Sequence, residues 1–423
     1  MTIVRAMTAR QLFLIVLGFA ILSALPLVLS PSLVNAAIKM LIAALFALAF
    51  SLAMGQAGML SFGHSAYYGI GAFAALHLMK AVEGHVLAWP TPLVPLVGAA
   101  AGLLAGIVFG WFATKRTGVY FAMVTLALAE LLFTLAPSWN SVFGGESGIS
   151  TMRMPSWAFS FGDDTHVYYL TLAWVALSAW CLWAFRGTPM GRLAVAMREN
   201  EHRVRFLGFN THLARTLVFA ISAMFTGVAG ALLAIANEAS NYTIFSAQAS
   251  ANVVLQTFIG GAGTFLGPAL GAAVMTFFAR VTSDLTRSWL LYQGLIFVLV
   301  MLFVPDGFGG LISMHVRRLH GAAIKHLLLP YLLCVVVGLL IIAGVVFMIE
   351  SAYVLLSDAY VAQRRSAGGA VVPYQLLGWK FDPLSPLTWS LSAGPLFIGG
   401  ALLPFAKRQT ELAWSRALDE SEQ

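Results

Sequence analysis

The chain has 423 residues, of which 60% are hydrophobic and 10% charged, and its formal net charge is +7. A soluble globular domain carries about a quarter charged residues, so this composition indicates an integral membrane protein. With roughly 20 apolar residues needed for each span, the length allows about ten to twelve helices. The basic residues cluster in short loops, where they set orientation, so the charge does not indicate nucleic-acid binding. Cys181 and Cys334 lie in apolar runs and are expected to pack there without a disulfide or a metal.

Apolar runs predict the spans in chain order. They lie near residues 11–30, 33–54, 60–80, 93–113, 118–136, 167–185, 216–236, 242–261, 265–281, 290–305, 327–349 and 386–405. The first run follows Arg5 and Arg10, as a signal peptide would, but it is longer than a signal-peptide core and another apolar run comes next. We therefore expect it to be a first transmembrane helix. The predicted fold is all-α, a polytopic transmembrane helical bundle of about ten spans or half-spans plus two extra C-terminal spans.

Loop charges predict the orientation of the chain in the membrane. Most positive charges precede span one, follow span four, separate spans six and seven, or follow span ten: Arg5, Arg10, Lys115, Arg116, Arg186, Arg192, Arg198, Arg203, Arg205, Arg215, Arg317, Arg318 and Lys325. All of these residues fall on one side of the membrane, the side of the N-terminus, if every run crosses it. By the positive-inside rule that side is cytoplasmic. Arg364, Arg365 and Lys380 fall in the last outer loop and break this pattern, so the rule does not fix the topology after residue 326.

The stretch from Gly55 to Gly71 is rich in glycine and polar residues, although apolar runs flank it on both sides. Irregular backbone at membrane depth requires protein or a water-filled cavity around it, so the stretch is a candidate border of a translocation path. A tight turn at the membrane surface, followed by a packing helix of small residues, fits equally well. Ionisable residues inside spans are costly, which adds Glu130 as a candidate, although a neighbouring helix could satisfy such a group. The candidate path residues are Gly58, Ser61, Phe62, Gly63, His64, Gly69, Gly71 and Glu130.

Two further segments carry glycine at every fourth position. The residues are Gly98, Gly102, Gly106 and Gly110 in the first and Gly263, Gly267 and Gly271 in the second. This spacing predicts helix faces against which a neighbouring helix packs closely. The sequence GGAGT at 260–264 lacks the Lys-Ser/Thr end of a phosphate loop, and GxxxxGK[ST] does not occur in the chain. We therefore expect no nucleotide site here.

The basic loop of residues 186–215 predicts one short amphipathic helix. Thr188 before Pro189 is a typical helix start, and Gly208 is a typical stop. The apolar residues Leu193, Met197, Val204 and Leu207 share one face, which only Asn200 interrupts. Such a helix could lie on the lipid surface or bind a partner protein, and the residue chemistry alone slightly favours the lipid surface.

Four motifs carry a resemblance to a known family. They are GRLAVAMRENE at 191–201 followed by LGFN at 207–210, GQAGMLSFGHSAYYGIGA at 55–72, GGAGTFLGPALGAA at 260–273, and TGVYFAMVTLALAE at 117–130. Their order and sequences resemble ABC importer permeases of the branched-chain amino acid type, and the last motif resembles the LivM subgroup. The resemblance runs from residue 11 to about residue 312. The residues around Arg203 and Val204 depart from the small residues usual in the family's loop.

The resemblance implies that the loop helix binds a cytoplasmic ATPase, which replaces the preference for the lipid surface. The implied ATPase-coupling residues are Gly191, Arg192, Met197, Arg198, Glu199, Asn200, Glu201, Leu207 and Gly208. The implied partners are ABC ATPase subunits that hold ATP and Mg, a second LivH-like permease and a periplasmic solute-binding protein. This chain would bind no cofactor, catalyse no reaction and lie in the bacterial inner membrane.

Four segments are expected along the chain: a permease core at 1–312, a basic cytoplasmic linker at 313–326, a transmembrane pair at 327–405 and a cytoplasmic tail at 406–423. The implied solutes are branched-chain or other hydrophobic amino acids, or related small solutes such as urea, amides or aromatic acids. An ATP-independent secondary transporter or channel with broken helices is the alternative. An intramembrane hydrolase using Ser61 or Ser65 with His64 is disfavoured, because these residues are too close in sequence and no acidic partner is near.

Overall fold

The computed structural model describes residues 9–157, 159–304, 306–318, 324–366, 373–376 and 379–422, and these residues are almost entirely helical. The chain forms two compact units. The first contains the described residues up to Asp284 and Gln293–Leu311, and the second contains Leu285–Tyr292 and the described residues from Ile312 onward. The all-α prediction is confirmed.

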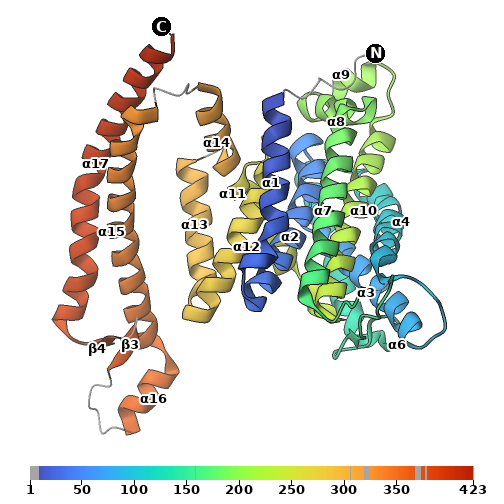
Figure 1. Ribbon diagram of the computed structural model, residues 1–423, viewed down its shortest axis with the longest axis horizontal. Coiled ribbons are helices and arrows are strands. Elements are labelled where there is room, and N and C mark those ends of the chain that lie inside the picture. Colours follow the sequence, from blue (N-terminus) through green and yellow to red (C-terminus); the bar gives the residue numbers. More distant parts are fainter. Residues whose placement is uncertain are drawn as a thin grey trace. The chain divides into compact units, whose positions relative to one another are not determined.

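Helices account for every predicted span (Figure 1). They are α1 (Ala9–Val28), α2 (Pro31–Ser51), α3 (His64–Glu83), α4 (Val94–Ala113), α5 (Val119–Leu135), α6 (Asn140–Phe143), α7 (Asp164–Gly187), α8 (Pro189–Glu199), α9 (Glu201–Phe206), α10 (Thr211–Asn237), α11 (Ala247–Gly260), α12 (Gly267–Leu285), α13 (Trp289–Phe303), α14 (Gly307–Arg318), α15 (Ile324–Leu356), α16 (Asp358–Ser366) and α17 (Pro386–Glu422). A π-helical turn, η1 (Leu52–Gln56), continues α2, and 3-10 turns lie at Thr91–Leu93, Ala136–Ser138 and Tyr242–Phe245.

Seven helical segments of the described residues are long and apolar enough to cross a membrane. They are Pro31–Gln56, Thr91–Ala113, Val119–Ser138, Asp164–Gly187, Thr211–Asn237, Leu327–Leu356 and Pro386–Arg416, and α13 with the start of α14 would make an eighth. The other predicted spans correspond to α1, α3, α11 and α12. The chain is therefore a multi-pass membrane protein.

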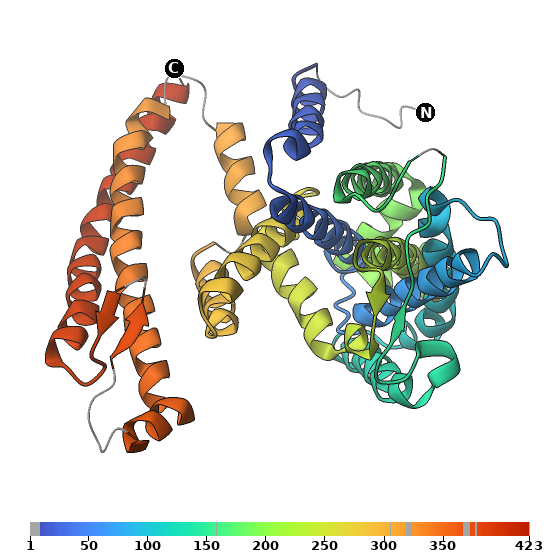
Figure 2. The ribbon, with the colours of Figure 1, turned by 60° about the horizontal axis from the view of Figure 1, so that its bottom comes forward.

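Helix α10 is the centre of the first unit, where α2, α3, α4 and α7 pack around it (Figures 1 and 2). Small residues allow this, because they let neighbouring backbones come close. A Cβ at Gly98 would lie 2.6 Å from the Gly227 carbonyl oxygen, and one at Gly106 would lie 2.6 Å from the Ala223 Cβ. Gly102 and Gly110 face the same helix. The first glycine series thus forms the face of α4 that contacts α10.

The second glycine series is only partly a helix face. Gly267 and Gly271 lie on α12 and approach the backbone of Gly260 at the end of α11. Gly263 differs from the expectation, because a Cβ there would meet no atom within 4 Å. The physical reason is that Gly263 lies in the turn before α12 begins, so it shares no helix face with the other two.

A loop between α5 and α7 covers one end of the first unit. Its strand β1 (Ile149–Ser150) pairs antiparallel with β2 (Ala239–Ser240), which follows α10. The Arg153 guanidinium, 9% exposed, donates to Glu238 at 2.9 Å and lies 3.8 Å from Asp164. At the start of α7 the Asp163 carboxylate accepts from the Thr165 N–H, and this hydrogen bond lowers the pKa of Asp163. These contacts fix the loop to α7 and α10.

The second unit is built on α15 and α17, which pack along their length. A Cβ at Gly344 would lie 2.6 Å from Leu396, and one at Gly399 would lie 2.6 Å from Ile341. The strands β3 (Tyr374–Leu376) and β4 (Trp379–Phe381) form an antiparallel pair. Residues 313–318 of the expected linker continue α14, residues 319–323 lie outside the described residues, and α17 continues through 406–422 of the expected tail. The segment boundaries stay predictions.

Candidate functional site

The glycine-rich stretch from Gly55 to Gly71 lies at the end of α2 and the start of α3. The backbone leaves α2 through the π-helical turn η1, and Gly58 then takes a positive φ of 68°. Ser61 and His64 are fully buried, Phe62 is half-buried and Gly58 is exposed. A sharp turn thus connects η1 to the buried start of α3.

His64 belongs to a hydrogen-bond chain in the interior. Ser222 on α10 donates its hydroxyl to the Ala49 carbonyl at 2.6 Å, so its oxygen accepts from His64 Nε2 at 2.9 Å. This geometry assigns the proton to Nε2. The rings of Phe50 and Phe219 stand edge-on around the imidazole, with centroids 5.0 and 5.2 Å away. His64 thus joins α2, α3 and α10 through Nε2, whereas its Nδ1 is buried without a hydrogen-bond partner among the described residues. Whether His64 contacts solute stays a prediction.

The serines of this stretch do not meet His64. Ser65 donates to the Phe245 carbonyl at 3.1 Å and accepts from Ser250 Oγ at 2.8 Å. Ser61 Oγ accepts from the Gly63 N–H at 3.3 Å. Both hydroxyls hold backbone in place, and no serine–histidine nucleophile is assembled from them.

The glycines of the stretch mark close contacts between helices. A Cβ at Gly63 would overlap the Thr125 carbonyl, one at Gly69 would overlap the Phe245 ring, and one at Gly71 would overlap the Gly227 carbonyl. Of the two alternatives for this stretch, the geometry has the features of a turn followed by a small-residue packing helix. Glu130 lies apart on α5, half-buried and without an ion pair among the described residues.

The basic loop forms two helices, so the prediction of one continuous helix is wrong. α8 ends at Glu199, and Asn200 takes an extended conformation with φ −157° and ψ 97°. Its side chain accepts from the Arg203 N–H at 3.0 Å and caps α9. Asparagine competes for backbone hydrogen bonds and therefore favours such a cap over a helix interior. The predicted start and stop are present, because Thr188 caps α8 and Gly208 has φ 87°.

The nine predicted coupling residues differ in burial. Gly191 packs on the backbone of Phe185 and Arg186, and Met197 is 3% exposed, so both support α8 from inside. Glu201 is half-buried, and the other six are exposed: Arg192, Arg198, Glu199, Asn200, Leu207 and Gly208. Phe206, which the sequence argument missed, is 90% exposed and Leu207 is 70% exposed. Exposed apolar residues next to basic ones are typical of an interaction surface.

A groove lies between α8 and the start of α10, on the same loop. Its volume is about 480 Å³, and it is lined by Pro189, Met190, Arg192, Leu193, Ala196, Phe209, Asn210, Leu213 and Ala214. Arg198, also on α8, donates from its guanidinium to the Gly55 carbonyl, and its Cγ lies 2.9 Å from the place of a Cβ at Gly58. The loop therefore contacts the irregular end of α2 directly.

Glu201 fixes α9 to α10, and its replacement should release α9. It accepts from Arg215 at 2.7 Å and from Arg205 at 3.2 Å, and the side chains of Arg215 and Glu201 are 12% and 20% exposed. Glu201→Ala leaves the Arg215 charge unpaired at a cost of about 1–3 kcal/mol. We expect tryptic cleavage after Arg203 or Arg205 to become about three times faster or more. Glu199→Ala, at an exposed residue without an ion pair among the described residues, is the control; equal rates for both variants would contradict the prediction.

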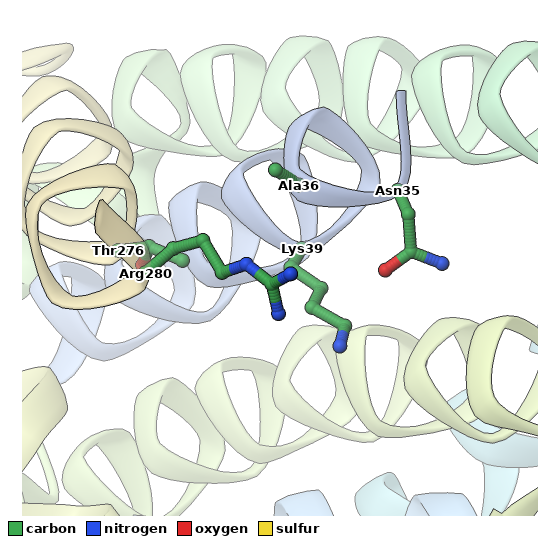
Figure 3. Close-up of a pocket in the computed structure, with 5 residues that line it drawn as sticks. All are labelled: Asn35, Ala36, Lys39, Thr276 and Arg280. Atoms are coloured by element: carbon green, nitrogen blue, oxygen red, sulfur yellow. The ribbon is translucent and has the colours of Figure 1, made fainter. Parts of the chain in front are cut away.

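A small polar pocket lies between α2 and α12 (Figure 3). Asn35, Ala36, Lys39, Thr276 and Arg280 line a volume of about 30 Å³. Figure 3 shows the Lys39 and Arg280 side chains reaching from their two helices into the same space. Neither cation is among the residues predicted from the sequence, although a lysine inside an apolar run is itself a signal of function.

The chain was compared with known proteins. A family model described as the permease component of the branched-chain amino acid transport system matches residues 32–305. The high-affinity branched-chain amino acid transport system permease protein LivM of Salmonella typhimurium is 28% identical over 322 residues, which cover 70% of this chain and 74% of that protein. The LivM of Escherichia coli is 27% identical over 340 residues, covering 75% and 79%.

A relative whose name gives a different cargo also matches. The autoinducer 2 import system permease protein LsrC of Yersinia pseudotuberculosis is 27% identical over 186 residues, 43% of this chain and 50% of that protein. No solved structure matches the chain.

Proposed function

Because the chain belongs to the family of branched-chain amino acid transport system permease components, we propose that it forms the translocation path of an ATP-driven importer. Transport, with no chemistry on the solute, is the activity of this family, and the chain is its permease subunit. We propose that ATP and Mg are bound by separate ABC ATPase subunits in the cytoplasm. The N-terminus would then be cytoplasmic, and the membrane would be the bacterial inner membrane.

The observation that carries the proposal is the surface formed by α8, α9 and the start of α10. It combines a groove of about 480 Å³ with the exposed side chains of Phe206 and Leu207. Hydrophobic grooves with an adjoining exposed apolar patch are typical of protein-binding surfaces. Arg198 connects this surface to the Gly55 carbonyl at the end of α2. An ATPase that moves α8 would therefore move α2 as well.

The relatives support a proposal for the solute and for the remaining partners. We propose a branched-chain or other hydrophobic amino acid as the solute, as in the names of the LivM relatives. A binding protein outside the membrane would deliver it, and a second, LivH-like permease would complete the path. The candidate path residues in the stretch from Gly55 to Gly71 would act by packing the helices that move, since most of them are buried.

Co-purification tests the coupling surface. The double variant Phe206→Asp, Leu207→Asp should lose the bound ATPase about ten-fold or more, because it puts two charges into an apolar interface. Its own fold should persist, since both side chains are exposed. His202→Ala, an exposed residue on α9, is the matched control and should retain the ATPase.

Two outcomes would overturn the proposal. The first is that no ATPase accompanies the wild type, and the second is that the double variant retains it in full. Solute uptake by the isolated chain in proteoliposomes without ATP would instead support the secondary transporter, for which the break of α2 at η1 is the favouring observation.

A further inference from the structure

Two helices of the first unit present matching pairs of side chains to each other. Asn35 and Lys39 are four residues apart on α2, and Thr276 and Arg280 are four residues apart on α12. Residues at this spacing share one helix face. Both helices thus offer a neutral hydrogen-bonding group and a cation to the pocket, whose volume is about 30 Å³ (Figure 3).

Of the two cations that line the pocket, only Arg280 has an ion pair among the described residues. Arg280 is paired with Asp284 at 3.5 Å on its own helix, where both side chains are more than half exposed. Asn35 donates to Asp164 at 3.5 Å, and Asp164 also faces Arg153 at 3.8 Å. Lys39 is half-buried and has no ion pair among the described residues. The pocket volume of about 30 Å³ is close to that of one water molecule, so only a small charged group at the end of a larger ligand fits beside Lys39.

Lys39 lies well inside its helix. It follows Pro31 by eight residues, which places it roughly 12 Å from the start of α2 at 1.5 Å per residue. A charged side chain at membrane depth is expensive unless it faces water, protein or a ligand, and it usually marks a solute or ion pathway. Lys39 and Arg280 reach into one space from different helices. A lysine that only extended its side chain to the membrane surface would not be expected to share a space with a cation of another helix.

A row of amide side chains leads along α11 toward this pocket. Gln248, Asn252 and Gln256 recur at every fourth residue, and each is exposed or half-buried. Gln248 donates to Asn252 at 3.2 Å, and Gln256 donates to Thr276 of the pocket at 3.5 Å. A polar row on an accessible helix face does not suit hydrocarbon, so this face lines water or a polar partner.

We propose that the pocket between α2 and α12 binds the carboxylate of the transported solute, with Lys39 and Arg280 as its cationic ligands. Asn35 and Thr276 add hydrogen bonds, and the amide row of α11 lines the approach. This proposal rests on the proposed function and deepens it, because it names a solute-binding site away from the stretch at 55–71. The phosphate of a phospholipid headgroup is also an anion that these two cations would bind. The experiment below distinguishes the solute carboxylate from such a phosphate.

The first arm measures the site without transport. Lys39→Cys is made in the full-length chain with Cys181→Ser and Cys334→Ser, in membrane vesicles, so that labelling does not depend on a bound ATPase. Because Arg280 remains beside the thiol, we expect an anionic methanethiosulfonate to react about five times faster than a cationic one, relative to Lys80→Cys at the exposed end of α3. Millimolar L-leucine should slow the reaction, and leucinamide, which lacks the carboxylate, should not. Arg280→Gln should remove the preference.

The second arm measures uptake. Lys39→Met should lower the kcat/KM for L-leucine about ten-fold to hundred-fold, the range of a lost charged hydrogen bond. Lys39→Arg should retain most uptake, and Lys80→Met should be unaffected. The amount of co-purified ATPase should equal that of the wild type in all three variants, which excludes misfolding, and the basal ATPase rate should be unchanged in Lys80→Met.

Three outcomes would overturn the carboxylate site. The thiol could be inert to both reagents, leucine could fail to protect it, or its reactivity could follow the anionic lipid content of the vesicles, which would assign the site to a phospholipid headgroup. Failure of the proposed function is distinguishable, because it removes ATPase binding and ATP-dependent uptake from the wild type but leaves the labelling arm readable.

Discussion

Gly102→Leu should abolish the folded protein, because it separates the two helices on which the first unit is built. A Cβ at this position would overlap the Ala223 carbonyl and lie 3.1 Å from the Gly227 Cα, and both belong to α10. Backbone atoms cannot rotate away as a side chain can, so α4 would have to shift as a whole. Overpacking typically costs about 1–3 kcal/mol and occasionally more, and we expect the upper end here because the atoms in the way are backbone. We expect loss of the monodisperse peak in detergent and a large fall in Tm.

The matched control is the same substitution at Gly18 on α1, where a Cβ would meet no atom within 4 Å. Gly18→Leu should express and elute like the wild type. If Gly102→Leu behaved like Gly18→Leu, the close contact of α4 with α10 would be wrong, and with it the central place of α10 in this unit.

Arg198→Ala should uncouple ATP hydrolysis from transport. The Arg198 guanidinium is the contact between α8 and the Gly55 carbonyl at the end of α2, while its backbone stays in a helix capped by Thr188. Its removal leaves the groove and the exposed Phe206 and Leu207 unchanged, so the ATPase should still bind. A coupling free energy of about 1–3 kcal/mol corresponds to a five-fold to 150-fold change, and we expect uptake per ATP hydrolysed to fall by about ten-fold.

Arg203→Ala on α9 is the control for this prediction, since its side chain is exposed. It should leave uptake per ATP unchanged. Parallel loss of ATPase binding and uptake in Arg198→Ala would show that Arg198 acts at the docking surface instead. Unchanged uptake would show that the contact with Gly55 transmits nothing.

Several features of this protein follow from its sequence alone. Hydropathy determines the membrane class and the approximate position of each long apolar helix, because a span must satisfy its own backbone hydrogen bonds and cover itself with apolar side chains. Thr188 with Pro189 determines where α8 begins, since a cap acts within three residues of the chain. The four motifs identify the family without any knowledge of contacts. Each of these signals depends only on residues that are close together in the sequence.

The tertiary structure alone decided which polar residues meet. The hydrogen-bond partner of His64 is Ser222 on α10, and Lys39 on α2 shares a pocket with Arg280 on α12. Neither pairing can be predicted from the residues that surround His64 or Lys39 in the sequence. From the sequence alone, the stretch around His64 is equally consistent with the border of a translocation path and with a helix-packing segment. Only its neighbours in the fold distinguish the two. Whether a glycine or a histidine contacts solute or another helix depends on what packs against it, and that is set by residues far away in the chain. Lys39 was visible in the sequence as a charge within an apolar run, but only the approach of α12 makes it part of a site.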